Sequence, residues 1–171
     1  MAKLPKRVSP DDMKFITHSA KQTQKLGQAL AQQLLRIRPR SKALVFGLQG
    51  DLGSGKTTFL KGFASGLGVK EKITSPTFVI MKRFSLNNKT AKQFHNFYHF
   101  DCYRLDKPED LLGLGWEEIV KNPYNIVALE WPERVKKALS KMYLRLQFTF
   151  LNPKNRQIII NYKVIKEKEN K

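Results

Sequence analysis

The chain has 171 residues, of which 41% are hydrophobic and 27% charged, and its formal net charge is +18. This length suits one domain with a substantial core, and no uninterrupted apolar run approaches the length of a membrane span. The lone Cys102 excludes an internal disulfide, so we expect a buried, inert thiol in a reducing cytoplasm. The basic segment 1–7 lacks the apolar stretch of a signal peptide, and we expect none.

The positive charge allows two interpretations. Lys and Arg are spread along the chain, with concentrations at both ends and at 134–137. Such an excess favours polyanions such as RNA, or acidic protein partners. No RNA-binding motif accompanies the basic residues, so a generally basic, solvated surface explains them equally well.

The N-terminal part of the chain predicts a tail, a strand and a helix. Residues 1–12 are polar and basic, which indicates a flexible tail, and 13–17 could form an edge strand. Ser19 followed by Gln22 is a capping-box pattern, which marks a helix start. The helix should end before Pro39, and its apolar face comprises Thr23, Leu26, Leu30, Leu34 and Ile37.

Residues 50–57, with the sequence GDLGSGKT, form the most informative motif. They match G-x-x-x-x-G-K-[ST], the phosphate-binding loop of P-loop nucleoside triphosphatases. An apolar strand is predicted before the loop at 43–48 and a helix after it at 57–67, as the motif requires. Backbone N–H groups bind phosphate, Lys56 reaches the outer phosphates and the Thr57 hydroxyl can bind Mg²⁺. The residues predicted to bind nucleotide here are Leu52, Gly53, Ser54, Gly55, Lys56, Thr57 and Thr58.

The rest of the chain alternates strands with helical turns. The expected elements are a hairpin of strands 78–84 and 94–103 about a polar turn at 87–89, helical turns across 108–120, a buried strand at 126–129, a short basic helix, and a second hairpin of strands 143–151 and 157–165. This order predicts an α/β fold, a P-loop NTPase three-layer sandwich with a mixed, mainly parallel sheet and added antiparallel strands. The domain should span 13–165, with a basic tail at 166–171.

Two acidic residues follow apolar strands. Asp101 comes after 97–100, and Glu130 comes after 126–129. In open α/β sheets ligands lie beyond the carboxyl ends of the strands, and Mg²⁺ is held through one or two carboxylates, phosphates and waters. Each acid could therefore face a metal-bound phosphate, or could equally be a solvated or locally paired acid.

Other polar residues carry weaker patterns. The charge of Asp51 would repel phosphates, so we assign it a structural role. Ser75 and Thr77 could order around the γ-phosphate or Mg²⁺, although the residues alone favour a turn before and after Pro76. Within its strand, His99 is interpreted as a core or surface histidine and not as a base. Trp131 is interpreted as a packing anchor.

Four segments, in this order, resemble the bacterial TsaE (formerly YjeE) family: GDLGSGKTTFLKGFASGLG, SPTF, YHFDCYRL and ALEWPER. The resemblance covers roughly residues 13–165. This family is the ATPase component of the machinery that makes threonylcarbamoyladenosine beside the anticodon of tRNAs reading ANN codons. The guanine-reading motif N-K-x-D is missing, since Asn88 and Lys89 are followed by Thr90 and Ala91, which argues against a GTPase.

The resemblance implies ATP and Mg²⁺ as cofactors, slow hydrolysis by the chain alone, and TsaB and TsaD as partners, with tRNA reached through their complex. It assigns catalytic roles to Lys56, Asp101 and Glu130, and metal binding to Thr57, Asp101 and Glu130. It further implies a switch-like loop at Ser75 and Thr77. It places Ala20, Thr23 and Arg156 beside the nucleotide base, and Trp131 next to the metal-binding Glu130. It leaves open whether Asp101 or Glu130 orients the attacking water.

Two other functions compete with this one. A stand-alone small-molecule kinase would need an acceptor pocket, and no arginine-rich lid segment supports it. A nucleotide-dependent binding module would use the same loop and metal ligands, with hydrolysis incidental. The sequence separates this module poorly from the ATPase.

Overall fold

One mixed sheet forms the centre of the molecule. The computed structural model describes residues 12–39, 41–74, 80–87, 91, 93–139 and 143–161. Within these ranges a 7-stranded sheet has the order β1-β7-β6-β2-β5-β4-β3. Its strands are β1 (Asp12–Thr17), β2 (Leu44–Gln49), β3 (Met81–Ser85), β4 (Asn96–Asp101), β5 (Asn125–Glu130), β6 (Leu144–Phe150) and β7 (Arg156–Asn161).

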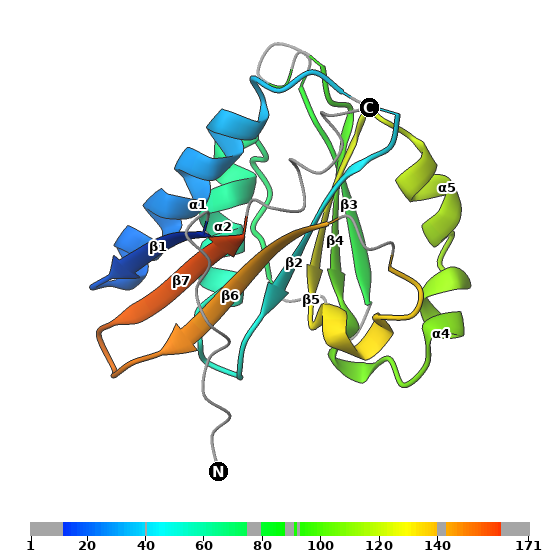
Figure 1. Ribbon diagram of the computed structural model, residues 1–171. Coiled ribbons are helices and arrows are strands. Elements are labelled where there is room, and N and C mark those ends of the chain that lie inside the picture. Colours follow the sequence, from blue (N-terminus) through cyan, green and yellow to red (C-terminus); the bar gives the residue numbers. More distant parts are fainter. Residues whose placement is uncertain are drawn as a thin grey trace.

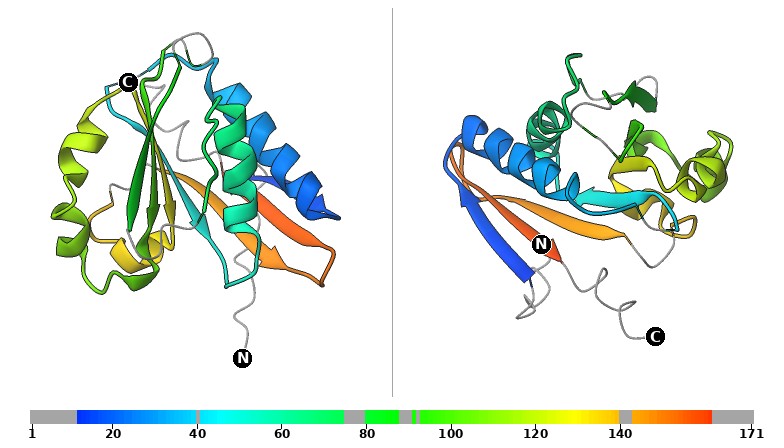
Figure 2. Two further views of the ribbon diagram at one scale, coloured as in Figure 1. Left: turned by 180° about the vertical axis from the view of Figure 1, so that it is seen from behind. Right: turned by 90° about the horizontal axis from the view of Figure 1, so that it is seen from above.

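Helices cover both faces of this sheet. Figures 1 and 2 show α1 (Ala20–Leu34) and α2 (Lys56–Gly66) on one face, and α4 (Pro108–Leu112) and α5 (Trp116–Lys121) on the other. Two 3₁₀ turns, η1 (Cys102–Arg104) and η2 (Pro132–Val135), follow β4 and β5. The predicted three-layer α/β architecture is confirmed. None of the helices in the described ranges is long and apolar enough to cross a membrane.

The direction of the central strands determines where a ligand can bind. β2 pairs in parallel with β5 and with β6, and β4 pairs in parallel with β5. Antiparallel pairing adds β3 to β4, β7 to β6 and β1 to β7, so the two predicted hairpins are confirmed. Because β2, β4 and β5 point the same way, their carboxyl ends meet at one edge of the sheet, where α2 begins.

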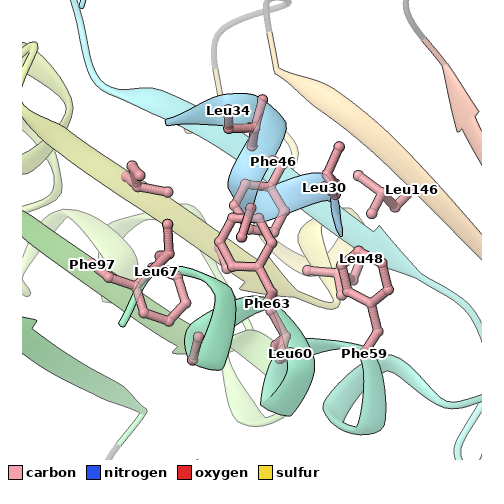
Figure 3. Packing of buried hydrophobic residues seen from close by; sticks show 14 of the residues in the cluster. Leu30, Leu34, Phe46, Leu48, Phe59, Leu60, Phe63, Leu67, Phe97 and Leu146 are labelled. Atoms are coloured by element: carbon pink, nitrogen blue, oxygen red, sulfur yellow. The ribbon is translucent and has the colours of Figure 1, made fainter. Parts of the chain in front are cut away.

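Aromatic side chains fix α2 on the sheet. Phe59 and Phe63 of α2 are 0% exposed, and the ring of Phe63 lies 4.6 Å from that of Phe46 in β2. Figure 3 shows this packing between α2, α1 and the strands. The two helices approach closely at Gly62, where the lack of a side chain lets α2 contact the backbone of Gln24 in α1. A Cβ atom at this position would collide with that backbone. This packing fixes the position of the first turn of α2.

Several boundaries differ from the sequence prediction. Ile37 lies beyond the end of α1 and is 37% exposed, so its assignment to the buried helix face was wrong. The predicted strand 94–103 ends at Asp101, whose carboxylate caps the η1 turn that follows. The residues 75–79, the middle of the turn at 88–89, the segment 162–165 and most of both predicted tails lie outside the described residues.

Candidate nucleotide-binding site

Glycines shape the loop between β2 and α2. Gly50, Gly53 and Gly55 have φ angles of 144°, 76° and 103°, values that residues with a Cβ atom rarely adopt. The chain thereby turns over the end of β2 and starts α2 at Lys56. The first N–H groups of a helix have no intrahelical partner and carry the positive end of its dipole. The loop therefore has the geometry of a phosphate-binding site.

Lys56 folds back over this loop. Its Nζ donates to the carbonyl oxygens of Gly50 and Asp51 at 2.6 and 3.0 Å, and lies 4.0 Å from the centre of the Trp131 ring. Trp131 has a left-handed backbone with φ 60°, which is uncommon for a bulky residue. Burial lowers the pKa of Lys56, and nearby carboxylates, that of Glu130 foremost, oppose this shift.

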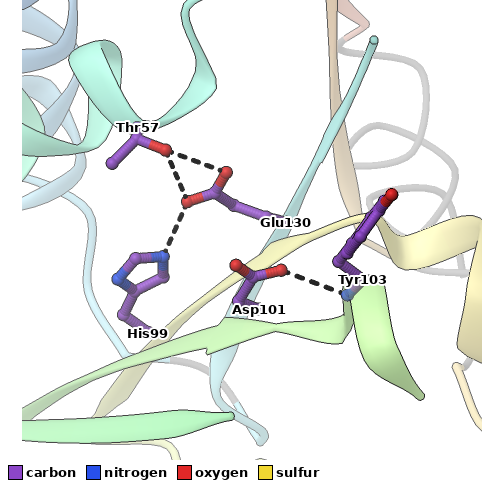
Figure 4. A network of polar contacts seen from close by, with 5 residues as sticks. All are labelled: Thr57, His99, Asp101, Tyr103 and Glu130. Atoms are coloured by element: carbon purple, nitrogen blue, oxygen red, sulfur yellow. Dashed lines mark hydrogen bonds and ion pairs between the residues drawn. The ribbon is translucent and has the colours of Figure 1, made fainter. Parts of the chain in front are cut away.

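Thr57 connects the loop to the end of β5. Its hydroxyl donates to Glu130 and lies 3.2 Å from both carboxylate oxygens. On the other side, His99 Nε2 lies 3.0 Å from Glu130 Oε1. His99 and Glu130 are 0% and 3% exposed. Figure 4 shows this chain of contacts from α2 through β5 to β4.

The pairing of β4 with β5 explains why these side chains meet. Asp101 is opposite Glu130, and His99 is opposite Ala128. Side chains alternate between the faces of a sheet, so His99, Asp101 and Glu130 all lie on the face that α2 covers. Because His99 is opposite Ala128, Glu130 reaches it diagonally across the strand pair.

Asp101 lies at the end of β4, opposite Glu130. Its Oδ1 accepts a hydrogen bond from Tyr103 N at 3.1 Å, and its backbone N–H donates to Ile80 O at 2.8 Å. The side chain is buried, and it lines the same pocket as Glu130. These contacts fix Asp101 at the end of β4.

A pocket of about 730 Å³ opens in front of the loop. This volume lies within the range of small-molecule sites. Of the predicted site residues, those lining the pocket are Ala20, Thr23, Leu52, Gly53, Gly55, Lys56, Thr57, Thr58, Asp101, Glu130, Trp131 and Arg156. Ser54 does not line the pocket; its side chain is buried, and its Oγ has no hydrogen-bond partner among the described residues. Ser75 and Thr77 lie outside the described residues.

The wall opposite the strand ends comes from α1 and the β6–β7 hairpin. Thr23 is 1% exposed, and its Oγ1 lies 2.7 Å from Thr17 Oγ1. Arg156 joins the hairpin to the loop, because its Nε donates to Gly53 O at 3.2 Å and its Nη1 to Asn152 O at 2.7 Å. The wall is therefore preformed and bonded to the phosphate loop.

Burial and nearby carboxylates raise the pKa values of groups next to the site. Burial raises the pKa of Cys102 to about 12, and the negative charges of Asp101, Glu133 and Glu130 act in the same direction. The thiol is buried, as expected from the sequence. Burial also raises the pKa of Glu133. Cys102 therefore carries its proton at neutral pH and cannot act as a thiolate nucleophile.

The donor groups fit a bound Mg²⁺ ion. Such an ion takes oxygen ligands, with one or two carboxylates and the remainder from phosphates and water. The Thr57 hydroxyl and the Glu130 carboxylate are in contact, and the Asp101 carboxylate borders the same pocket. The described residues contain no group of three His, Cys, Asp or Glu side chains that could hold a metal by themselves. Nucleotide phosphates would have to complete the coordination.

Sequence reasoning missed the role of some neighbours. His99 is a buried histidine, in agreement with its interpretation as a core residue, and its contact with Glu130 was not predicted; its position two residues before Asp101, on the same face, was the available signal. Tyr103 packs on Trp131 with ring centres 5.1 Å apart and also lines the pocket. His18 and Lys154 contribute to the wall, and no motif marks them.

Comparison with known proteins relates this sequence to a family. The sequence profile described as "Threonylcarbamoyl adenosine biosynthesis protein TsaE" matches residues 17–158. The chain belongs to the TsaE family. The matched range contains the phosphate loop, both acidic strand ends and Arg156.

Individual members of the TsaE family are similar in sequence to this chain over most of their length. A protein of Treponema pallidum, named tRNA threonylcarbamoyladenosine biosynthesis protein TsaE, is 33% identical over 86% of this chain and 99% of its own length. A protein of Rickettsia conorii with the same name is 34% identical over 85% of this chain and 77% of its own. The crystal structure of Bacillus subtilis YdiB superposes with a TM-score of 0.65 at 26% identity, covering 87% of this chain and 84% of that one.

Proposed function

We propose that this chain is the magnesium-dependent, ATP-binding and ATP-hydrolysing subunit required for threonylcarbamoyl modification of the adenosine beside the anticodon in tRNAs reading ANN codons. The observation that carries the proposal is the contact of Thr57, in the phosphate loop, with Glu130 at the end of β5. It brings a hydroxyl and a carboxylate together beside the glycine-rich loop and the first turn of α2. Membership of the TsaE family supports the pathway.

Each part of the pocket has a distinct task in this proposal. The N–H groups of the loop and Lys56 bind the phosphates, and Lys56 exchanges its contacts with backbone carbonyls for the more strongly accepting phosphate oxygens. Thr57, Glu130 and Asp101 would hold Mg²⁺, which when bound would neutralise negative charge on the nucleotide phosphates. Glu130 or Asp101 orients the attacking water. Trp131 covers Lys56.

The base and ribose would lie against the wall formed by α1 and the β6–β7 hairpin. Ala20, Thr23 and Arg156 line this side of the pocket. The planar guanidinium group of Arg156 can stack on a base, and it already lies 4.4 Å from the centre of the Phe150 ring. We propose that Ser75 and Thr77 respond to the γ-phosphate as a switch-like segment.

Hydrolysis by this subunit would serve partner proteins, which we propose to be TsaB and TsaD in the cytoplasm. An ATPase assay of the chain with and without the TsaB–TsaD pair tests this. We expect weak turnover alone, stimulation by the pair, and loss of turnover in the Lys56→Ala variant. No stimulation, together with phosphate transferred to a small metabolite, would identify a stand-alone kinase instead.

Direct contact with tRNA is a separate question, raised by the net charge of +18. We propose that tRNA is reached through the complex and that the basic surface of the free chain is non-specific. Binding of the isolated chain to tRNA and to an unrelated polyanion, measured across a salt series, tests this. Preference for tRNA that persists at high salt would contradict it.

A further inference from the structure

His99 is a polar side chain in a fully buried position. It is 0% exposed, on β4, and its neighbour along this face of the strand is the core residue Phe97. Its Nε2 lies 3.0 Å from Glu130 Oε1, while its Nδ1 has no hydrogen-bond partner among the described residues. A buried nitrogen without a partner costs free energy that an apolar side chain would avoid. The contact with Glu130 is therefore the feature that distinguishes histidine from an apolar residue here.

The contact has a defined direction. Glu130 already accepts a hydrogen bond from Thr57, and a carboxylate oxygen can only accept. The nitrogen that faces Oε1 must therefore donate, which places a proton on Nε2.

This hydrogen bond distinguishes the two oxygens of Glu130. Thr57 Oγ1 lies 3.2 Å from each of them, so the threonine alone does not fix the rotation of the carboxylate. Rotation about this last torsion is intrinsically broad. His99 bonds Oε1 and not Oε2, which fixes the plane of the group and leaves Oε2 turned away from the histidine.

We propose that His99 is a positioning residue, which fixes the Glu130 carboxylate against Thr57 and thereby sets the strength of the magnesium-dependent step. This inference rests on the proposed function. His99 does not line the pocket, so it acts through Glu130 without touching nucleotide. Outer partners that orient metal-binding groups typically change metal affinity or activity by about 10- to 100-fold.

Two matched substitutions test the donor itself. In His99→Gln the side-chain amide reaches as far as Nε2 and keeps a donor for Glu130. In His99→Asn the amide reaches only the position of Nδ1. The measurement is the affinity for ADP by calorimetry, in Mg²⁺ and in EDTA, on variants that melt cooperatively.

We expect His99→Asn to bind ADP normally in EDTA but to lose about tenfold or more of the affinity that Mg²⁺ adds. His99→Gln should recover most of it. In single-turnover hydrolysis at saturating Mg-ATP we expect a lower rate constant in His99→Asn, which His99→Gln should largely recover. A folded His99→Asn chain with the full magnesium effect would overturn the inference.

A measurement without substitution of His99 covers the case in which the variants do not fold. The chain has three histidines, so the ¹⁵N ring signals of His99 are those that persist when His18 and His95 are replaced by Gln. We expect a proton on Nε2, whose signal moves with Mg-ADP but not with ADP in EDTA. A ring without a proton on Nε2, or no response to Mg²⁺, would overturn the inference. Failure of the wild-type chain to bind nucleotide at all would instead overturn the proposed function, and this inference with it.

Discussion

The ends of β4 and β5 are built alike in sequence but differ in their contacts. Each strand is buried and terminates in an acid, and Asp101 and Glu130 are opposite each other and 4% and 3% exposed. Glu130 contacts Thr57 and His99, which belong to other elements. Asp101 accepts a hydrogen bond from Tyr103 N, two residues along its own chain. Equal placement and burial thus permit different tasks, with Glu130 connecting the site across the sheet and Asp101 also shaping the turn that follows it.

The largest effect is expected from removing the ammonium group of Lys56, which lines the same pocket as Asp101 and Glu130. Lys56→Ala should lower ATP turnover about a hundredfold or more, because the ammonium that we propose to bind the phosphates is lost. Steady-state release of phosphate measures it. Lys61→Ala, an exposed lysine on the same helix, is the matched control and should retain normal turnover. Equal rates of phosphate release in both variants would contradict the proposed site.

A smaller but selective loss is expected at the end of β5. Glu130→Gln keeps the size of the side chain but removes its charge, so the affinity that Mg²⁺ adds to nucleotide should fall about 10- to 100-fold. Fluorescence titration with a labelled ADP, with and without Mg²⁺, measures this. Glu117→Gln, at an exposed acid paired with Lys121, provides the control. A magnesium effect of normal size in Glu130→Gln would assign the metal to Asp101 alone.

At the end of β4, charge and turn formation can be separated. Asp101→Asn retains an oxygen that can cap Tyr103 N, so it should leave the melting temperature nearly unchanged while lowering turnover. Asp101→Ala should in addition lower the free energy of unfolding by about 1 kcal/mol, the typical value for loss of a cap. Thermal melting and phosphate release, measured on both variants, give the two contributions. Normal turnover in Asp101→Asn would limit this acid to its capping role.

The smallest change expected concerns Cys102, directly after Asp101. Because burial and the surrounding carboxylates raise its pKa to about 12, the thiol stays protonated, and the folded chain should not react with iodoacetamide between about pH 7 and 9. The chain unfolded in urea should react with the ordinary pH dependence of a cysteine. Mass spectrometry of the alkylated protein measures both. Rapid labelling of the folded chain would show that the end of β4 opens.

The phosphate loop and the two candidate acidic ligands could be predicted from the sequence because each is marked by its neighbours along the chain. A glycine-rich loop between an apolar strand and a helix indicates a phosphate site, and an acid after each apolar strand indicates a candidate ligand. The contact of His99 with Glu130 could not be read in the same way. It depends on the register that sets His99 opposite Ala128, between strands that are distant in sequence.

Two further features depended on backbone conformations that composition does not specify. Trp131 covers Lys56 and has a left-handed backbone conformation. Glycine and asparagine adopt this conformation far more often than tryptophan does, so the sequence does not predict it. The predicted strand 94–103 stops early because the Asp101 carboxylate caps η1. In both cases a tertiary or side-chain contact outweighed the local propensity.

That the phosphate loop and the two strand ends form one Mg-nucleotide site is tested most directly by calorimetry. A non-hydrolysable ATP analogue is titrated into the wild-type chain in Mg²⁺ and again in EDTA. We predict binding at a single site that is tighter in Mg²⁺ and is lost in Lys56→Ala. Binding of equal strength with and without Mg²⁺, or no binding by the wild-type chain, would contradict the role given to Thr57, Asp101 and Glu130.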